Sequence, residues 1–194
     1  MTDTATLNPP LSRSLKTETH AAHEALDNSI MAAQPFASRE RYGLFLAVQH
    51  QFHRDIHAIY RDQRIAALLP DLRARCRLPD LEADLVDLDL QADAQDAVEP
   101  GDDLATRLGW LYVAEGSNLG AAFLIKAAAK LGLSETFGSR HLSGAPEGRG
   151  LHWKRFQQAL DAAKLDDAGQ ARAVAGAVAA FKRVQALADR AFGA

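Results

Sequence analysis

Apolar positions recur at the three- and four-residue spacing of amphipathic helices along most of the 194 residues, and no stretch alternates as a β-strand does. This pattern predicts an all-α protein. After Pro9-Pro10, one apolar face predicts a first helix that ends near Gln34-Pro35. Its members are Leu15, Thr19, Ala22, Leu26 and Ile30.

Ser38 is expected to cap a second, long helix, because a side-chain oxygen before the first turn satisfies a free backbone N–H. The stripe of this helix contains polar members and comprises Tyr42, Phe45, Leu46, Gln49, Phe52, His53, Ile56 and Tyr60. Further helices are expected over residues 65–69, 80–88, 102–131, 151–163 and 167–192, and residues 138–150 are loop-like. No linker divides the chain, so we expect one domain over residues 1–194, with a flexible N-terminus over 1–10.

The predicted helix 102–131 carries glycines in its interior. Gly116 and Gly120 are four residues apart with Ser117 and Asn118 between them, and each interior glycine costs a helix roughly 1 kcal/mol relative to alanine. A helix break or close packing of two helices through small residues explains this spacing. Close approach of a ligand to the backbone explains it equally well.

Composition narrows the possible partners. The net charge of −3 and the pI near 6.1 argue against nucleic acid as the main partner. Cys76 is the only cysteine, which excludes an intrachain disulfide framework and a cysteine-built zinc site. No apolar run has the length of a membrane span or the form of a secretion signal, so we expect a cytoplasmic protein without a membrane partner.

Two histidines lie in the first predicted helix. His23 is at the edge of the apolar stripe and is therefore expected to be buried, whereas His20 lies toward the polar side. Lys16 precedes His23 by two helical turns, about 10 Å along the axis. This separation suits an axial ligand and an anion-binding ammonium at one haem, although a core histidine and a solvated lysine are the simpler interpretations.

Three more histidines in the second helix, His50, His53 and His57, follow the spacing H-x-x-H-x-x-x-H. We discount a metal site there, because helical di-metal sites also need carboxylates in Glu-x-x-His spacing and the chain has none. His53, beside Gln49 on the apolar stripe, suits a buried hydrogen-bonding role. His50 and His57 are expected at the surface.

The sequence shows no nucleophilic machinery. Ser117 lacks the G-x-S-x-G context of a hydrolase. Cys76 lies in the basic run 73–77, which is expected to be exposed; basic neighbours can lower a thiol pKa, but a chance thiol is the simpler interpretation. Trp153 offers an indole N–H that seeks a partner when buried, but core packing explains it as well.

Three segments in order along nearly the whole chain resemble the bacterial haem oxygenases of iron acquisition. They are Leu15-Lys16-Thr17-Glu18-Thr19-His20-Ala21-Ala22-His23, the glycine-bearing stretch 109–124, and the stretch 138–153 that ends in Gly150-Leu151-His152-Trp153. Some close relatives continue beyond the Phe-Gly ending with a tail that reaches the site, whereas this sequence stops at Ala194.

The resemblance implies a helical fold with haem, as both substrate and prosthetic group, between a proximal helix and a kinked distal helix. It implies His23 as the axial iron ligand and Lys16 and Tyr112 as propionate contacts, with Phe181 near the proximal side. The distal kink is implied to comprise Gly116, Ser117, Asn118, Leu119 and Gly120. A distal hydrogen-bonded network is implied to comprise His53, Gln49 and Trp153. Glycines then admit dioxygen close to the backbone. Of these residues, Gly116, Ser117, Asn118, Gly120 and His53 are implied in catalysis.

The implied reaction cleaves haem b with O2 and reducing equivalents to biliverdin, carbon monoxide and ferrous iron. An external reductase or ferredoxin is the implied partner, and we expect a monomer. A haem carrier or sensor on the same fold is the non-enzymatic alternative, and a hydrolase such as a thiamin-degrading enzyme is the other enzyme class. The hydrolase would need a cysteine or paired carboxylates in the pocket, and Cys76 lies outside the segments assigned to it.

Overall fold

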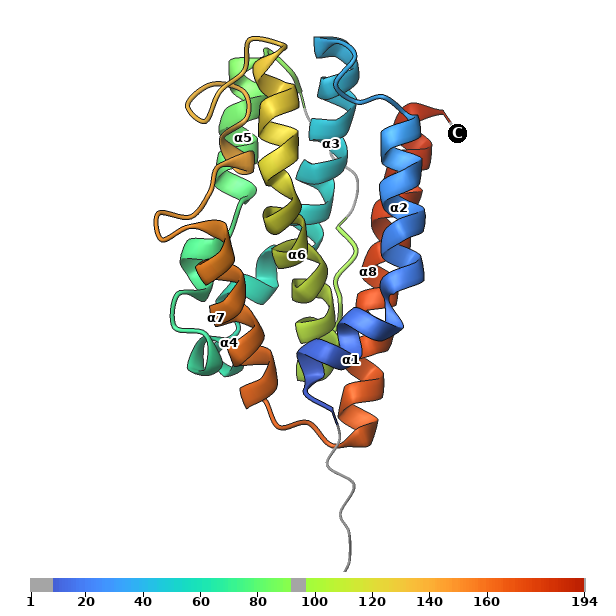
Figure 1. The fold of residues 1–194 in the computed structure, drawn as a ribbon, viewed down its shortest axis with the longest axis vertical. Coiled ribbons are helices and arrows are strands. Elements are labelled where there is room, and N and C mark those ends of the chain that lie inside the picture. The colour runs from blue at the N-terminus through green and yellow to red at the C-terminus, as the bar shows by residue number, and fades with distance from the viewer. Residues whose placement is uncertain (1–8, 92–96, 194) are drawn as a thin grey trace, which may run out of the picture.

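The structure is a computed structural model that describes residues 9–91 and 97–193, and within them it is all-helical (Figure 1). The elements are α1 (Leu11–Glu18), α2 (His20–Ala32), α3 (Arg39–Asp55), η1 (His57–Arg61), α4 (Gln63–Leu68), η2 (Leu72–Arg75), α5 (Leu78–Asp87), α6 (Leu104–Ala129), η3 (Arg140–Leu142), α7 (Arg149–Ala162) and α8 (Asp167–Phe192). The all-α prediction is confirmed. Most of the N-terminal segment expected to be flexible lies outside the described residues.

The first predicted helix is divided into α1 and α2 at Thr19, so the prediction of one helix to Gln34 is wrong. Thr19 has non-helical backbone angles (φ −104°, ψ 2°), and its hydroxyl donates to the carbonyl of Leu15 at 2.7 Å. A hydroxyl that bonds the preceding turn competes with regular helix geometry and bends the chain. α2 then packs mainly against α8.

The second predicted helix begins as expected. The Ser38 side chain accepts from the backbone N–H of Arg41, which confirms the cap. The helix ends at Asp55, earlier than its apolar stripe suggested, and Tyr60 is buried from the short 3₁₀ turn η1 instead. The apolar spacing therefore continues from the α-helix α3 into the 3₁₀ turn η1, and it does not mark where α3 ends.

Helices α6 and α8 pack against each other more extensively than any other two elements described. Gly109 of α6 lies against the backbone of α8, where an added Cβ would overlap the carbonyl oxygen of Ala173 and lie 2.7 Å from the Ala177 nitrogen. Gly176 of α8 reciprocates, because its Cβ would lie 2.5 Å from the Thr106 carbonyl oxygen. These two glycines allow the helix axes to approach closely.

Figure 1 shows α6 through the middle of the molecule, with α7 on one side of it and α2 with α8 on the other. α6 passes through Gly116 and Gly120 without interruption, so these glycines do not break it. The predicted helix end is confirmed at Gly132, which takes the left-handed conformation (φ 75°) just beyond α6. None of the helices in the described ranges is long and apolar enough to cross a membrane.

Candidate functional site

One face of α6 is open where the sequence places its paired glycines. A Cβ added at Gly120 meets no atom within 4 Å, and one at Gly116 meets only the Trp153 ring, at 3.9 Å. Beside them Leu119 is 42% exposed and Phe123 is 79% exposed. The explanation by close helix packing is therefore wrong for Gly116 and Gly120, because no atom of another helix comes nearer to either position than the Trp153 ring. What remains is a bare, apolar helix face.

His23 lies on α2, and the prediction that it is buried is wrong. Its side chain is 57% exposed, because α2 packs on α8 and buries only Leu26 completely. The imidazole meets the Phe181 ring edge to face at 5.8 Å, and its Nε2 lies 3.5 Å from the Asp27 carboxylate. An accessible imidazole that packs against one aromatic ring fits the role of a ligand better than the role of a core residue.

Tyr112 of α6 lies beside the junction between α1 and α2. Burial raises the pKa of the half-buried Tyr112 phenol. The Thr19 hydroxyl, which lies within hydrogen-bonding reach of the phenol, opposes this rise. Lys16 is exposed in the last turn of α1, three residues before this junction. The structure therefore brings Tyr112 to the chain segment that carries both Lys16 and His23.

Trp153, at the start of α7, closes one flank of the open face. Its ring contacts Tyr112 at 5.6 Å and Phe156 at the same centroid distance. Trp153 also lines a small cavity together with Asn118 and Leu119. Asn118 Nδ2 is buried without a hydrogen-bond partner, whereas the Ser117 hydroxyl already donates to the carbonyl of Ala114 at 2.7 Å.

His53 is almost fully buried on α3, as the sequence predicts, one turn beyond the half-buried Gln49. Burial lowers its pKa to about 3, and the charges of His141, Arg77 and His50 act in the same direction. The ring is therefore neutral, and its Nδ1 has no hydrogen-bond partner. The His53 ring meets the Phe52 ring edge to face, with the centroids 5.8 Å apart.

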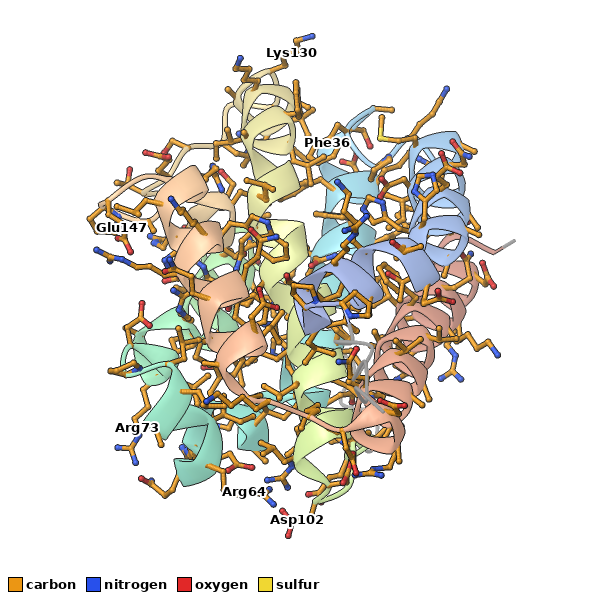
Figure 2. The ribbon with its side chains drawn as sticks, turned by 60° about the horizontal axis from the view of Figure 1, so that its bottom comes forward. Phe36, Arg64, Arg73, Asp102, Lys130 and Glu147 are labelled. Carbon is orange, nitrogen blue, oxygen red and sulfur yellow. The ribbon has the colours of Figure 1, made fainter. Side chains whose placement is uncertain are left out.

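The other histidines of α3 and the basic run differ from expectation. His50 is buried, and His57 is half-buried with its Nδ1 3.6 Å from Cys76 Sγ. Burial raises the pKa of the Cys76 thiol, which agrees with the simpler interpretation of a chance thiol. Figure 2 shows Arg73 pointing outward, as a basic run should, but Arg75 is fully buried.

A buried ion pair behind the open face was missed in the sequence. Arg75 donates to Glu115 at 2.8 Å, and neither side chain is exposed. His152 of α7 adjoins this ion pair. It is half-buried, and its ring lies between the carboxylates of Glu115 and Glu147. The only available signal was Glu115 itself, a charged residue inside the apolar stretch 109–124.

Asp71, Glu147 and His152 bring ligand atoms within 4.8 Å of one another, the one such group of three among the described residues. Arg75 lies 3.1 Å from Asp71, and Arg155 lies 3.2 Å from Glu147. Because arginines already neutralise both carboxylates, ion pairing accounts for this group. We assign no metal to it.

These features match the chemistry of a haem site. An accessible imidazole suits an iron ligand, an apolar face with two bare glycine positions suits a flat macrocycle, and Lys16 with Tyr112 offers a cation and a hydroxyl for carboxylates. The accessible imidazole, the cation and the hydroxyl come from α1, α2 and the adjoining turn of α6. The open glycines come from the next two turns of α6.

Comparison with known proteins agrees with this interpretation. Residues 9–190 match the family model described as Heme oxygenase. Heme oxygenase PigA of Pseudomonas aeruginosa is 41% identical over 183 residues, which are 93% of this chain and 92% of that protein. The NO- and CO-bound heme oxygenase from Neisseria meningitidis superposes with a TM-score of 0.91 at 39% identity, covering 96% of this chain and 94% of that one.

Proposed function

The chain belongs to the haem oxygenase family, and from this premise we propose that its haem lies between α2 and the open face of α6, with His23 as the axial iron ligand. The family reaction is oxidative cleavage of haem by O2 to biliverdin, carbon monoxide and ferrous iron. Haem supplies the iron that activates dioxygen. The chain positions the macrocycle, leaves space for the small ligand and excludes bulk water.

On the proximal side, His23 binds through a nitrogen of its accessible imidazole, and Phe181 packs edge to face against that ring. Lys16 and Tyr112 hold the propionates, and thereby set how the macrocycle is rotated about the iron axis. A charge-assisted hydrogen bond of this kind contributes roughly 1.5–3 kcal/mol. The rotation decides which meso carbon faces the open helix.

On the distal side, Gly116 and Gly120 leave room for dioxygen against the backbone, because nothing but Trp153 lies within 4 Å of a side chain at either position. Ser117 acts through its backbone, since its hydroxyl is already bonded to Ala114. Asn118 offers the unpaired donor Nδ2. Leu119 contacts the macrocycle, and Gln49, His53 and Trp153 form the polar layer behind it.

The observation that carries the proposal is the open face at Gly120, in a helix that could have used alanine there without a clash. A carrier or sensor needs only a ligand and an apolar groove, so the expense of two interior glycines favours turnover over mere binding. We further propose an external protein electron donor, a role in iron acquisition, a cytoplasmic location and a monomeric state.

The axial ligand is tested with His23→Ala, and the chain offers a matched control in His20→Ala. Both side chains lie on α2, both are more than half exposed (57% and 69%), and each has a carboxylate four residues later, so loss of either should affect folding equally. We expect His23→Ala to lose the axial-imidazole absorption spectrum of the haem complex and most turnover, with recovery on adding imidazole.

His20→Ala should retain both the spectrum and the turnover. An unchanged spectrum in His23→Ala would contradict the assignment of the ligand. The enzyme is distinguished from a carrier by an aerobic absorption time course of the haem complex with a chemical reductant. Loss of the Soret band with growth of a biliverdin band indicates turnover, whereas a stable Soret band indicates a carrier.

A further inference from the structure

The polar cluster behind α6 contains more ionisable groups than the proposed haem site uses. Glu115 is completely buried in the middle of the molecule, and Arg75 neutralises one of its oxygens. Its other oxygen, Oε1, has no hydrogen-bond partner. A buried carboxylate with a free oxygen is costly, so it calls for a functional explanation or an ordered water.

His152 connects this carboxylate to the surface. Its Nδ1 lies 3.2 Å from Glu147 Oε1, and its Nε2 lies 3.5 Å from Glu115 Oε2 on the other side of the ring. The second contact lacks hydrogen-bond geometry, so Nε2 remains unsatisfied. The imidazole is 13% exposed, and Figure 2 shows Glu147 at the outer edge of the molecule. One ring therefore spans from a surface carboxylate to a buried one.

The inner end of this connection meets a cavity that is also lined by Leu119 and Trp153, which border the open face. Glu115 and Asn118 lie three residues apart on one side of α6, and both line the same cavity as His152, Arg77 and Trp153. The cavity measures about 10 Å³, on the order of the space for one water. Glu115 Oε1, Asn118 Nδ2 and His152 Nε2 are three unpaired buried atoms around it, which is the number of partners that a buried water prefers.

Resting on the proposed function, we propose that His152 is a proton relay, which carries protons from Glu147 at the surface to Glu115 and the cavity beside Asn118. Dioxygen reduction takes up protons at a site closed to bulk water. A proton arrives at Nδ1 through Glu147, and the proton on Nε2 leaves to Glu115 or to a water in the cavity. Rotation of the ring restores the starting tautomer, and only N–H and O–H bonds are made and broken.

The surrounding charges suit this role. The neighbouring carboxylates of Glu115 and Glu147 raise the pKa of His152, while burial and the Arg75 charge oppose the rise. Arg155 and Asp71 are the other charged groups at the outer end, and they pair with Glu147 and Arg75 respectively. A histidine between two carboxylates exchanges protons readily near neutral pH.

The test compares His152→Gln with the control Arg155→Gln, which removes another partner of Glu147 outside the relay. With reductant and O2 we expect haem cleavage by His152→Gln to slow about tenfold or more, with a larger solvent deuterium isotope effect. Hydrogen peroxide supplies reduced oxygen that already carries its protons, so cleavage driven by peroxide should stay within about twofold of the wild type. Arg155→Gln should behave as the wild type in both assays.

Equal slowing with O2 and with peroxide would overturn the relay and leave His152 a structural brace. Unchanged rates in both would overturn it as well. An NMR titration of the haem-free protein provides a readout without activity: Glu147→Gln should lower the pKa of His152, and an unmoved titration would contradict the coupling. If the wild type itself leaves haem intact, the proposed function fails, and this titration still judges the proton connection.

Discussion

Helix α6 contains glycines in two places with opposite surroundings. At Gly109 the backbone of α8 is so close that a Cβ would lie 2.7 Å from the Ala177 nitrogen, besides overlapping a carbonyl oxygen. At Gly120 nothing beyond the adjoining backbone of α6 itself lies within 4 Å of the same added carbon. Gly109 is needed because the backbone of α8 occupies the position that a side chain would take. At Gly120 the same position is empty.

The comparison separates two reasons for an identical choice of residue. Gly109 and Gly176 set the distance between the two central helices, so their contribution is to folding. Gly116 and Gly120 contribute nothing to packing that alanine would not, and they weaken the helix. The proposed function accounts for them, because haem and dioxygen require close approach to the backbone.

The largest expected effect is that of Gly109→Ala, which tests the closed side of the comparison. The methyl group must push α8 away from α6, because the clash is with backbone and no side chain can move aside. We expect the free energy of unfolding to fall by about 3 kcal/mol or more, at or beyond the upper end for an overpacked core. Urea denaturation of the haem-free protein measures this, and wild-type stability in the variant would contradict the packing role.

A second prediction concerns His53, which is buried on α3. The pKa of His53 falls from 6.5 to about 3 on folding, so between these values the unfolded chain binds a proton that the folded chain does not. Stability is therefore lost as the pH falls below 6.5, by about 2 kcal/mol from this group between pH 6.5 and 4.5. His53→Gln should show a correspondingly shallower loss in denaturation at these two pH values. Parallel curves for variant and wild type would contradict it.

Much of the fold follows from the sequence because helical periodicity is a local property. The long helices α6 and α8 and the Ser38 cap lie where apolar spacing and capping residues place them. The division at Thr19 depends on one hydroxyl bonding the preceding turn, which periodicity does not reveal. The early end of α3 escapes prediction for a related reason, since Tyr60 remains buried from a different helix type.

The site was less predictable, because burial depends on which faces find a partner. His23 was expected inside and is exposed, whereas His50 and Arg75 were expected outside and are buried. In each case the sequence fixes the position on its own helix but not the neighbouring helix. Glu115 and His152 meet through such a neighbour, from α6 and α7, and no local pattern pairs them.

The variant Gly120→Ala has the smallest expected effect on stability and gives the most direct test of the central claim. That claim is that Gly120 leaves space for a ligand. Gly120→Ala should raise the free energy of unfolding of the haem-free protein by about 0.5–1 kcal/mol, because alanine favours the helix and meets no atom. In the same sample, with haem bound at one equivalent, biliverdin formation should slow severely as the methyl occupies the space of dioxygen. Raised stability together with a wild-type yield and rate of biliverdin would contradict the account.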